Sequence, residues 1–395
     1  MIRYAQDAVE RAMKVQEVIL RAASGKLQWF EAAEILGISC RTMYRWKMRY
    51  DRHGYDGLFD RRRRLPSPKR VPMNQVRQVL QLYRDGYAGF NVKHFHEKLT
   101  EEHGVKLSYA WVKAALQTAG LVRTGRRRVA HRQRRERRPM RGMMLFCDGS
   151  THAWLPLADQ KQDLIAFVDD ATSEVYEAYL VPEEGTLTVM AGLKAIVQRE
   201  GLFCSLYTDR GSHFFHTPRV DGPVDKSRLT QIGRALQRLG IEAIPSYSPQ
   251  ARGRMERFFG TWQGRLPQEL RKAGITTMEA ANAFIRQKMI PWHNRKLAVS
   301  PAQTGHTFVP CSNVDLDEIL CIQDERVVQQ DNTVVLEHVR FQIPPHRSRP
   351  SFARCTVRIC QHLDHTVTIR CGPHLLGRYR DDGTLIDKPT KQKVA

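Results

Sequence analysis

The chain has 395 residues, which is too long for a single compact core and predicts several domains of ordinary size. Lys and Arg number 63 against 41 Asp and Glu, and the resulting net charge of +22 favours a polyanionic partner. A basic protein without such a partner, or one that binds anionic membranes, is the alternative. No run of roughly 18 apolar residues is present to span a bilayer, and the first residues do not resemble a signal peptide. We therefore expect a cytoplasmic protein with no membrane partner.

Residues 1–60 predict a helical DNA-binding domain with a helix-turn-helix. Ala33 is small enough for two helices to touch, Gly37 suits the turn, and Ser39 is placed to cap the second helix. Five residues of that helix are then expected to face a DNA major groove, namely Arg41, Thr42, Tyr44, Arg45 and Lys47. An ordinary helical hairpin is the alternative interpretation.

Residues 72–122 repeat the helical pattern and predict a second helix-turn-helix, with or without a wing, or else a plain three-helix bundle. Residues 123–142 follow as a basic linker, in which positions 123–141 hold ten arginines and one glutamate. Such a run is often merely solvated. Because it joins a DNA-binding region to a different domain, we expect it to follow phosphates, with Arg126, Arg127 and Arg128 among the DNA contacts.

Residues 143–305 change to apolar runs alternating with helical stripes, in the order β-β-β-α-β-α-β-α, which predicts a mixed α/β sheet. Its second helix is expected to be capped at Ser227. Residues 318–385 hold six short strands separated by turn residues, which predicts a small β-barrel. The eight cysteines lack zinc-finger spacing, so we expect reduced thiols and no zinc site.

Two of the apolar runs end in a carboxylate, at Asp148 and at Asp209, and a third carboxylate, Glu256, opens an amphipathic helix. Strand ends hold side chains at the sheet edge where ligands bind in α/β folds. Three converging carboxylates repel one another, and hard cations such as Mg²⁺ relieve that repulsion. Two such ions would clamp the attacking and leaving oxygens of a phosphodiester displacement. Asp169 and Asp170 also end a strand, and we interpret them as a turn.

The segments around the three acids resemble those of bacterial insertion-sequence transposases with an integrase core, of the ISNCY type. The resemblance lies in Phe146 to Trp154, in Tyr207 to Ser212 and in Ser248 to Arg257. It implies a multidomain chain with N-terminal all-α helix-turn-helix modules, a ribonuclease-H-like integrase core and a small C-terminal β-barrel. It also implies that Asp148, Asp209 and Glu256 are catalytic and hold Mg²⁺ or Mn²⁺, as two ions.

The implied activity is DNA transposition, with metal-dependent cleavage of 3′ ends at the element termini and strand transfer into target DNA. Double-stranded DNA is then the partner, as terminal inverted repeats and as target, and two ends require at least a dimer in the bacterial nucleoid. Four arginines flank the acids as candidate phosphate contacts or as plain exposed residues: Arg210, Arg252, Arg254 and Arg257. The 46 residues between Asp209 and Glu256 exceed the spacing of many integrases, so residues 217–226 are a further candidate DNA contact.

Two other functions fit the same features. A regulator or an inactive transposon remnant would bind the ends without cutting, although the presence of all three acids argues against decay. A structure-selective nuclease would cut without joining, although two helix-turn-helix modules favour sequence-specific ends. No Gly-x-x-x-x-Gly-Lys sequence is present, which argues against ATP-driven action by this chain.

Overall fold

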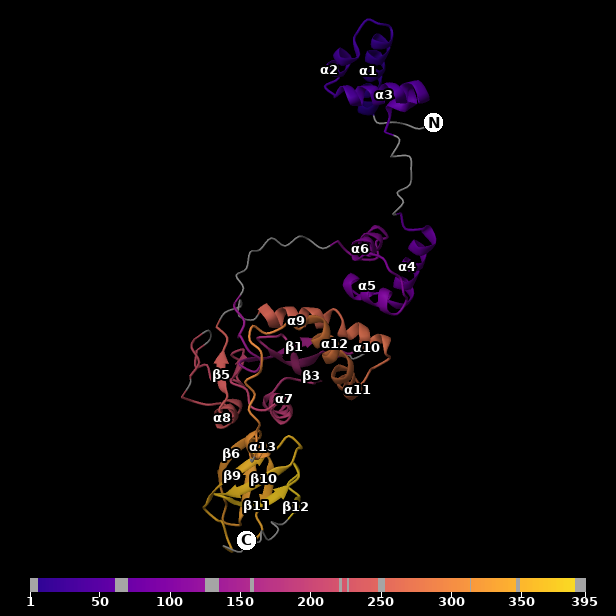
Figure 1. Ribbon diagram of the computed structural model, residues 1–395. Helices are drawn as coiled ribbons and strands as arrows, with labels where there is room; N and C mark the ends of the chain where they lie inside the picture. The colour runs from indigo at the N-terminus through magenta and orange to yellow at the C-terminus, as the bar shows by residue number, and fades with distance from the viewer. Residues whose placement is uncertain are drawn as a thin grey trace. The chain divides into compact units, whose positions relative to one another are not determined.

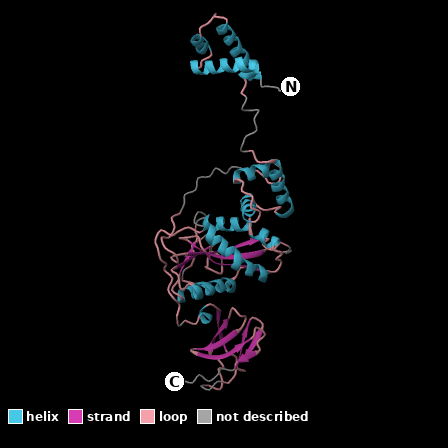
Figure 2. Cartoon of the chain, turned by 45° about the vertical axis from the view of Figure 1, so that its right-hand side comes forward, coloured by secondary structure: helices cyan, strands magenta, loops and turns pink. Residues whose placement is uncertain are grey.

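The computed structural model describes residues 6–60, 70–124, 135–156, 160–219, 222–225, 227–247, 253–312, 314–345 and 349–387. The chain divides into two compact units, Met1–Val79 and Leu80–Ala395. Helix α4 (Met73–Gly86) crosses the boundary between them. The described part of the chain is helical up to residue 124, mixed in the middle and mostly β-stranded from residue 322 onward (Figure 2). None of the described helices is long and apolar enough to cross a membrane.

The first unit contains the predicted helix-turn-helix. Helices α1 (Gln6–Ala23), α2 (Trp29–Ile35) and α3 (Cys40–His53) pack around a core that includes Val15, Ala33 and Met43. Gly37 has a φ of +64°, a conformation that glycine adopts without strain. The Ser39 hydroxyl accepts a hydrogen bond from Thr42 N at 3.3 Å and so caps α3. The turn and the cap are therefore as the sequence predicts.

The second unit begins with the rest of α4, followed by α5 (Val92–Glu101) and α6 (Tyr109–Thr118), and residues 70–124 contain no strand. Ser108 caps α6 by accepting from Trp111 N at 3.3 Å. One face of α5 contacts helix α10 (Leu266–Lys272) of the following domain. The buried His94 ring Nε2 lies 2.6 Å from Glu269 Oε1, and Lys98 Nζ lies 2.8 Å from the same oxygen.

The central domain is built on a five-stranded mixed sheet in the order β3-β2-β1-β4-β5. Its strands are β1 (Leu145–His152), β2 (Gln162–Asp169), β3 (Val175–Val181), β4 (Ser205–Thr208) and β5 (Glu242–Pro245). The first three strands pair antiparallel, whereas β1, β4 and β5 pair parallel. This confirms the predicted mixed α/β sheet.

Helices cover both faces of this sheet (Figure 1). Helices α7 (Thr186–Arg199) and α8 (Gln231–Arg238) pack on the face that includes Leu145 and Cys147. Helix α9 (Gly253–Gln263) and α10 pack on the face that includes Phe146, together with α11 (Met278–Phe284), the π-helix Ile285–Met289 and α12 (Ile290–Leu297). Helix α8 begins later than expected, because its cap is Thr230, which accepts from Gly233 N at 3.1 Å, and not Ser227.

The C-terminal domain is an open sheet among the described residues, where the sequence predicts a small barrel. Its strands pair in the order β12-β11-β10-β9-β6, and β7 pairs only with β8. Helix α13 (Leu316–Ile319) precedes the strands β6 (Ile322–Val327), β7 (Thr333–Leu336), β8 (Val339–Gln342), β9 (Thr356–Gln361), β10 (Val367–Cys371), β11 (His374–Tyr379) and β12 (Leu385–Asp387). A closed barrel is not confirmed, because β6 and β12 lie at opposite edges and do not pair.

Two asparagines occupy the free edge of β3. The side chain of Asn294 accepts from Val175 N at 2.8 Å and donates to Val175 O at 3.0 Å. Asn282 does the same at Leu180, with distances of 2.7 and 3.0 Å. An edge strand otherwise presents unpaired N–H and C=O groups that invite another strand. These side-chain amides therefore take the place of a neighbouring strand.

We predict that Asn294→Leu destabilises the β3 edge by about 1–3 kcal/mol, because it leaves part-buried backbone groups without partners. Hydrogen–deuterium exchange measures this directly as faster exchange of the Val175 amide. Asn282→Leu is the matched control and should act at the Leu180 amide instead. If both variants exchange equally at the Val175 and Leu180 amides, each asparagine does not protect its own site on β3.

Candidate active site

Strand pairing brings the first two predicted acids to neighbouring positions. Phe146 of β1 pairs with Tyr207 of β4, and their rings contact edge to face with centroids 5.3 Å apart. Asp148 and Asp209 each come two residues later in their own strand direction. Because neighbouring strands lie about 5 Å apart and alternate residues share a face, both carboxylates belong to the sheet face that α9 covers.

A fourth carboxylate, Glu184, lies at the same edge, between β3 and α7. Its Oε1 lies 3.1 Å from His213 Nε2, and a Cβ at Gly149 would overlap its carboxylate. Gly211 N donates to Asp209 Oδ1 at 2.9 Å and so fixes that carboxylate. Burial raises the pKa of the Cys147 thiol well above its usual value, and the nearby charges of Glu184, Asp148 and Asp209 raise it further. Acidic charge therefore gathers around Cys147.

The third acid, Glu256, lies in the first turn of α9 and is exposed. Two turns further along, Gln263 Nε2 donates to Ser150 Oγ at 3.1 Å, which ties α9 to β1 just beyond Asp148. Residues seven apart lie on one face of a helix, so Glu256 shares the face of α9 that contacts β1. The helix thus presents Glu256 on the side of the two aspartates.

A preformed three-ligand metal site is not present in the part of the chain that the structure describes. No three His, Cys, Asp or Glu side chains there are arranged to hold a metal ion. The donor chemistry of Asp148 and Asp209 still fits Mg²⁺, which is commonly bound by one or two carboxylates together with substrate phosphates. Strand pairing sets Asp148 and Asp209 on neighbouring strands, and the role of all three acids as metal ligands stays a prediction.

The predicted arginine contacts fall into different environments. Arg210 donates to Gly222 O at 2.8 Å within the 217–226 segment, and its guanidinium lies 5.4 Å from the Tyr247 ring centroid. Arg254 donates to Arg135 O at 2.8 Å and pairs with Asp170, so its guanidinium is engaged inside the domain. Arg257 is exposed. Arg126, Arg127, Arg128 and Arg252 lie outside the described residues.

The predicted base-reading residues of helix α3 differ in their exposure and in their contacts. Arg41, Tyr44 and Arg45 are exposed. Thr42 is part of the helix cap, with its Oγ1 2.9 Å from Ser39 Oγ, and Lys47 Nζ lies 5.0 Å from the Trp29 ring centroid. The exposed three are therefore the residues best placed to reach a ligand.

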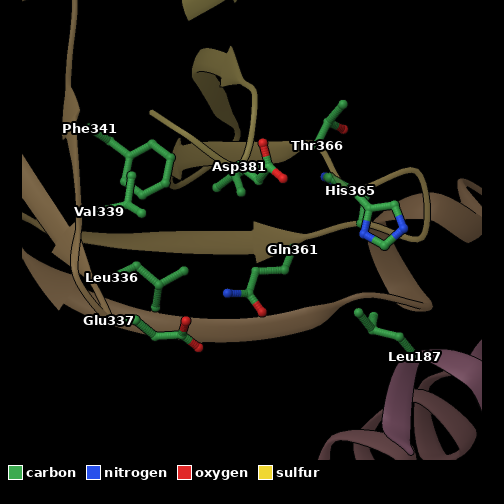
Figure 3. Close-up of a pocket in the computed structure, with 11 residues that line it drawn as sticks. Leu187, Leu336, Glu337, Val339, Phe341, Gln361, His365, Thr366 and Asp381 are labelled. Atoms are coloured by element: carbon green, nitrogen blue, oxygen red, sulfur yellow. The ribbon is translucent and has the colours of Figure 1, made fainter. Parts of the chain in front are cut away.

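A cavity of about 190 Å³ lies away from these residues, on the C-terminal sheet (Figure 3). Its lining includes Leu336, Phe341, Gln361 and His365, with Leu187 contributed by α7. None of the predicted catalytic or DNA-binding residues lines it. We therefore do not assign it to the acidic site.

A buried histidine fixes α9 against α12. Trp262 Nε1 donates to His293 Nδ1 at 3.0 Å, and His293 Nε2 lies 3.2 Å from Ser173 O. This requires the neutral ring with its proton on Nε2, because Nδ1 must accept. Burial lowers the pKa of His293 to about 4. A second proton, on His293 Nδ1, would point an N–H donor at the N–H donor of Trp262 Nε1.

We predict that this histidine makes the core less stable in acid. The unfolded chain binds the proton with a pKa of about 6.5 and the folded chain only near 4, so stability falls as pH drops through this window. The loss reaches at most about 3 kcal/mol below pH 4. Thermal melting followed by tryptophan fluorescence from pH 7 to 4 measures it. His293→Gln should remove this part of the pH dependence, and an unchanged dependence would exclude His293 as its source.

Two family models match the N-terminal region. A model described as a helix-turn-helix domain covers residues 16–66, and one described as a homeodomain-like domain covers residues 42–116. These matches agree with the α2–α3 geometry and extend into the second helical module. The chain therefore carries helix-turn-helix features typical of DNA-binding proteins.

Two curated relatives align with most of the chain. The "Putative transposase y4bF" of Sinorhizobium fredii (strain NBRC 101917 / NGR234) is 28% identical over 369 residues, which is 93% of this chain and 80% of the relative. The "Transposase for insertion sequence IS1202" of Streptococcus pneumoniae is 28% identical over 360 residues, which is 82% of this chain and 75% of the relative. The resemblance to bacterial insertion-sequence transposases is thus confirmed along most of the chain.

Solved structures of integrases also resemble the chain, at low scores. The simian T-cell lymphotropic virus intasome in complex with PP2A regulatory subunit B56 gamma is 14% identical, covering 69% of this chain and 91% of that one, with a TM-score of 0.34. The HTLV-2 integrase catalytic core domain in complex with magnesium (dimeric form) is 15% identical, covering 42% and 94%, with a TM-score of 0.29.

Proposed function

We propose that this chain is a DNA transposase that cleaves element ends and joins them to target DNA. The observation that carries the proposal is the β1–β4 pairing, which brings Asp148, within β1, next to the end of β4, where Asp209 follows. Helix α9, which bears Glu256, packs on the same sheet. The names of the two curated relatives support the same activity. So does the presence of a helix-turn-helix in the N-terminal unit.

The three acids have distinct supports. Asp148 is held by the paired strand β1, Asp209 by its hydrogen bond from Gly211 N, and Glu256 by the packing of α9. Mg²⁺ or Mn²⁺, as two ions, would activate the attacking oxygen and stabilise charge on the phosphate. The HTLV-2 core was solved with magnesium, which is consistent with this choice of metal. Asp148 and Asp209, with Glu256, would hold these ions.

The proposed reaction has two steps and no covalent enzyme intermediate. Water attacks a phosphodiester at the element end, the P–O bond to the leaving 3′ oxygen breaks, and that oxygen takes up a proton as a free 3′-OH. This hydroxyl then attacks a phosphodiester of target DNA, a new P–O bond forms, and a second 3′-OH leaves. Each attack is in line with the departing oxygen, so the two ions would stabilise the attacking and the leaving oxygens on opposite sides of the phosphorus.

The DNA contacts follow from the exposed basic residues. Arg41, Tyr44 and Arg45 of α3 would read terminal inverted repeats in the major groove. The arginine-rich segment and Arg257 would contact phosphates, and Arg210 would hold the 217–226 segment toward DNA. Holding two ends at once requires at least a dimer. A DNA substrate would locate the protein in the bacterial cytoplasm, at the nucleoid.

One observation favours a second candidate, a regulator that binds ends without cutting. Within the described residues the acids do not form a group of three arranged to hold a metal. Such a protein would keep the helix-turn-helix function and lose the chemistry. Cleavage assays separate the two candidates.

We predict that the protein nicks a supercoiled plasmid carrying the DNA that flanks its gene when Mg²⁺ or Mn²⁺ is added. Mapping of 3′ ends should locate the nicks at defined termini, followed by joining. Glu256→Gln should slow cleavage by at least about 100-fold, the loss typical of removing one group that stabilises transition-state charge. Glu279→Gln is the matched control, because Glu279 is an exposed acid in the first turn of α11.

Specific binding to the flanking DNA without metal-dependent nicks would reject the transposase in favour of the regulator. Nicks without joining would favour the nuclease. Equal cleavage by the wild type and Glu256→Gln would remove Glu256 from the site.

A further inference from the structure

Asp170 carries more interactions than a turn residue needs. It follows β2 and its backbone N donates to Met144 O at 3.0 Å, as expected of a turn that packs on the sheet. Its carboxylate is fully buried, and Oδ1 is paired with two guanidinium groups, those of Arg135 and Arg254. Oδ2 accepts from Arg138 N at 2.6 Å. One buried carboxylate thus joins three segments that are distant in sequence.

The neighbouring Asp169 provides the contrast. Its carboxylate accepts from Thr172 N at 2.8 Å and from Gly142 N at 2.9 Å, so it closes the turn by itself. The side chain of Asp170 is therefore not required to close that turn. Its partners come instead from the end of the arginine-rich segment and from the start of α9.

The arginine partners hold each other as well as Asp170. Arg254 Nη2 donates to Arg135 O at 2.8 Å, and the Arg135 guanidinium lies 5.7 Å from the ring centroid of Phe146, two residues before Asp148. Arg137 Nη1 donates to Asp170 O at 3.0 Å and to Ser173 Oγ at 2.9 Å. This cluster, which we call the Asp170 clamp, consists of Asp170, Arg135, Arg137, Arg138 and Arg254.

The clamp acts on the first turn of α9. Arg254 is the second residue of that helix, and Glu256 lies two residues further on. Removal of one member of a buried ion pair leaves the other without compensation, which is strongly unfavourable. Burial lowers the pKa of the Arg254 guanidinium, and the charge of Asp170 works in the opposite direction. The first turn of α9 is therefore tied to the turn after β2 through this pair.

We propose that Asp170 is a positioning residue for Glu256. By holding Arg254, it sets the start of α9 and with it the place of the third acid beside Asp148 and Asp209. This inference rests on the proposed function. It also makes the arginine-rich segment part of the same arrangement, because Arg135 and Arg254 share one carboxylate oxygen.

The first test needs no DNA or metal. Hydrogen–deuterium exchange of the full-length protein is compared between the wild type and Asp170→Asn, which keeps the size of the side chain and removes its charge. We expect the amides of residues 257–260, whose N–H groups bond to the carbonyls of the first turn, to exchange at least about tenfold faster, with those of α7 unchanged as an internal control. Arg254→Lys keeps the charge but shortens the contact, and it should produce the same local change if Asp170→Asn does not fold.

The second test asks whether the effect passes through Glu256. Mn²⁺ affinity is measured by electron paramagnetic resonance of the free ion, and cleavage is measured on the plasmid described above. Asp170→Asn should weaken Mn²⁺ binding about fivefold or more and slow cleavage at least tenfold, with binding to flanking DNA within about twofold. In the Glu256→Gln background the same change should add no further loss of Mn²⁺ affinity.

If the amides of residues 257–260 exchange at the wild-type rate in both folded variants, Asp170 does not hold the start of α9. If Asp170→Asn lowers the Mn²⁺ affinity just as much in the Glu256→Gln background, Asp170 does not act on metal binding through Glu256. If the wild type itself neither binds Mn²⁺ nor cleaves, the proposed function fails and the positioning role falls with it. If the wild type cleaves DNA and Asp170→Asn cleaves it equally well, the proposed function stands and only the positioning role of Asp170 is rejected.

Discussion

The acidic edge of the core depends on the parallel pairing of β1 with β4. These strands are distant in the sequence, and the pair Phe146–Tyr207 sets their register. A shift of one residue in either strand would turn its carboxylate to the opposite face, because side chains alternate along a strand. The buried layers on both faces resist such a shift, since Leu145 and Cys147 pack toward α7 while Phe146 packs toward α9. The core thus fixes on which face the acids lie.

Helix α9 is the second requirement, and it is attached at several points along its length. Arg254 is held by Asp170 near its start, Trp262 by His293 near its end, and Gln263 by Ser150 of β1. Between these points Met255 and Phe258 are buried against the sheet. Polar contacts at both ends and apolar contacts between them give the helix one position relative to β1. The position of Glu256 in the first turn of α9 therefore follows from the position of the helix.

The sequence predicted what local patterns determine. Gly37 and Ser39 specified the helix-turn-helix, and the alternation of apolar runs and helical stripes specified the mixed sheet. The predicted start of α8 is wrong because two nearby residues, Thr230 and Ser227, are both of a type that can cap a helix. The barrel was inferred from strand number alone, and closure depends on pairing between the first and last strands, which no short pattern records.

Side-chain partners that are distant in sequence were beyond prediction. The sequence offers Arg254 as a phosphate contact or as a plain exposed residue because it flanks Glu256. In the structure its guanidinium pairs with Asp170, and no spacing in the sequence links those positions. The sequence prediction omits Glu184, which follows the end of β3 as Asp209 follows the end of β4, so the same reasoning applies to it. Asn282 and Asn294 cap the β3 edge through backbone groups, a role that leaves no mark in composition.

The most direct test of the central claim, that Asp148, Asp209 and Glu256 share one metal site, replaces Mg²⁺ by Fe²⁺. With hydrogen peroxide as oxidant and ascorbate to reduce Fe³⁺ back to Fe²⁺, the bound iron generates hydroxyl radicals that cut the polypeptide beside it, and the fragments map its surroundings. We expect cuts near residues 148, 209 and 256 that excess Mg²⁺ suppresses and that Asp148→Asn abolishes. Cuts confined to other segments, or cuts at these three that persist in Asp148→Asn, would contradict it.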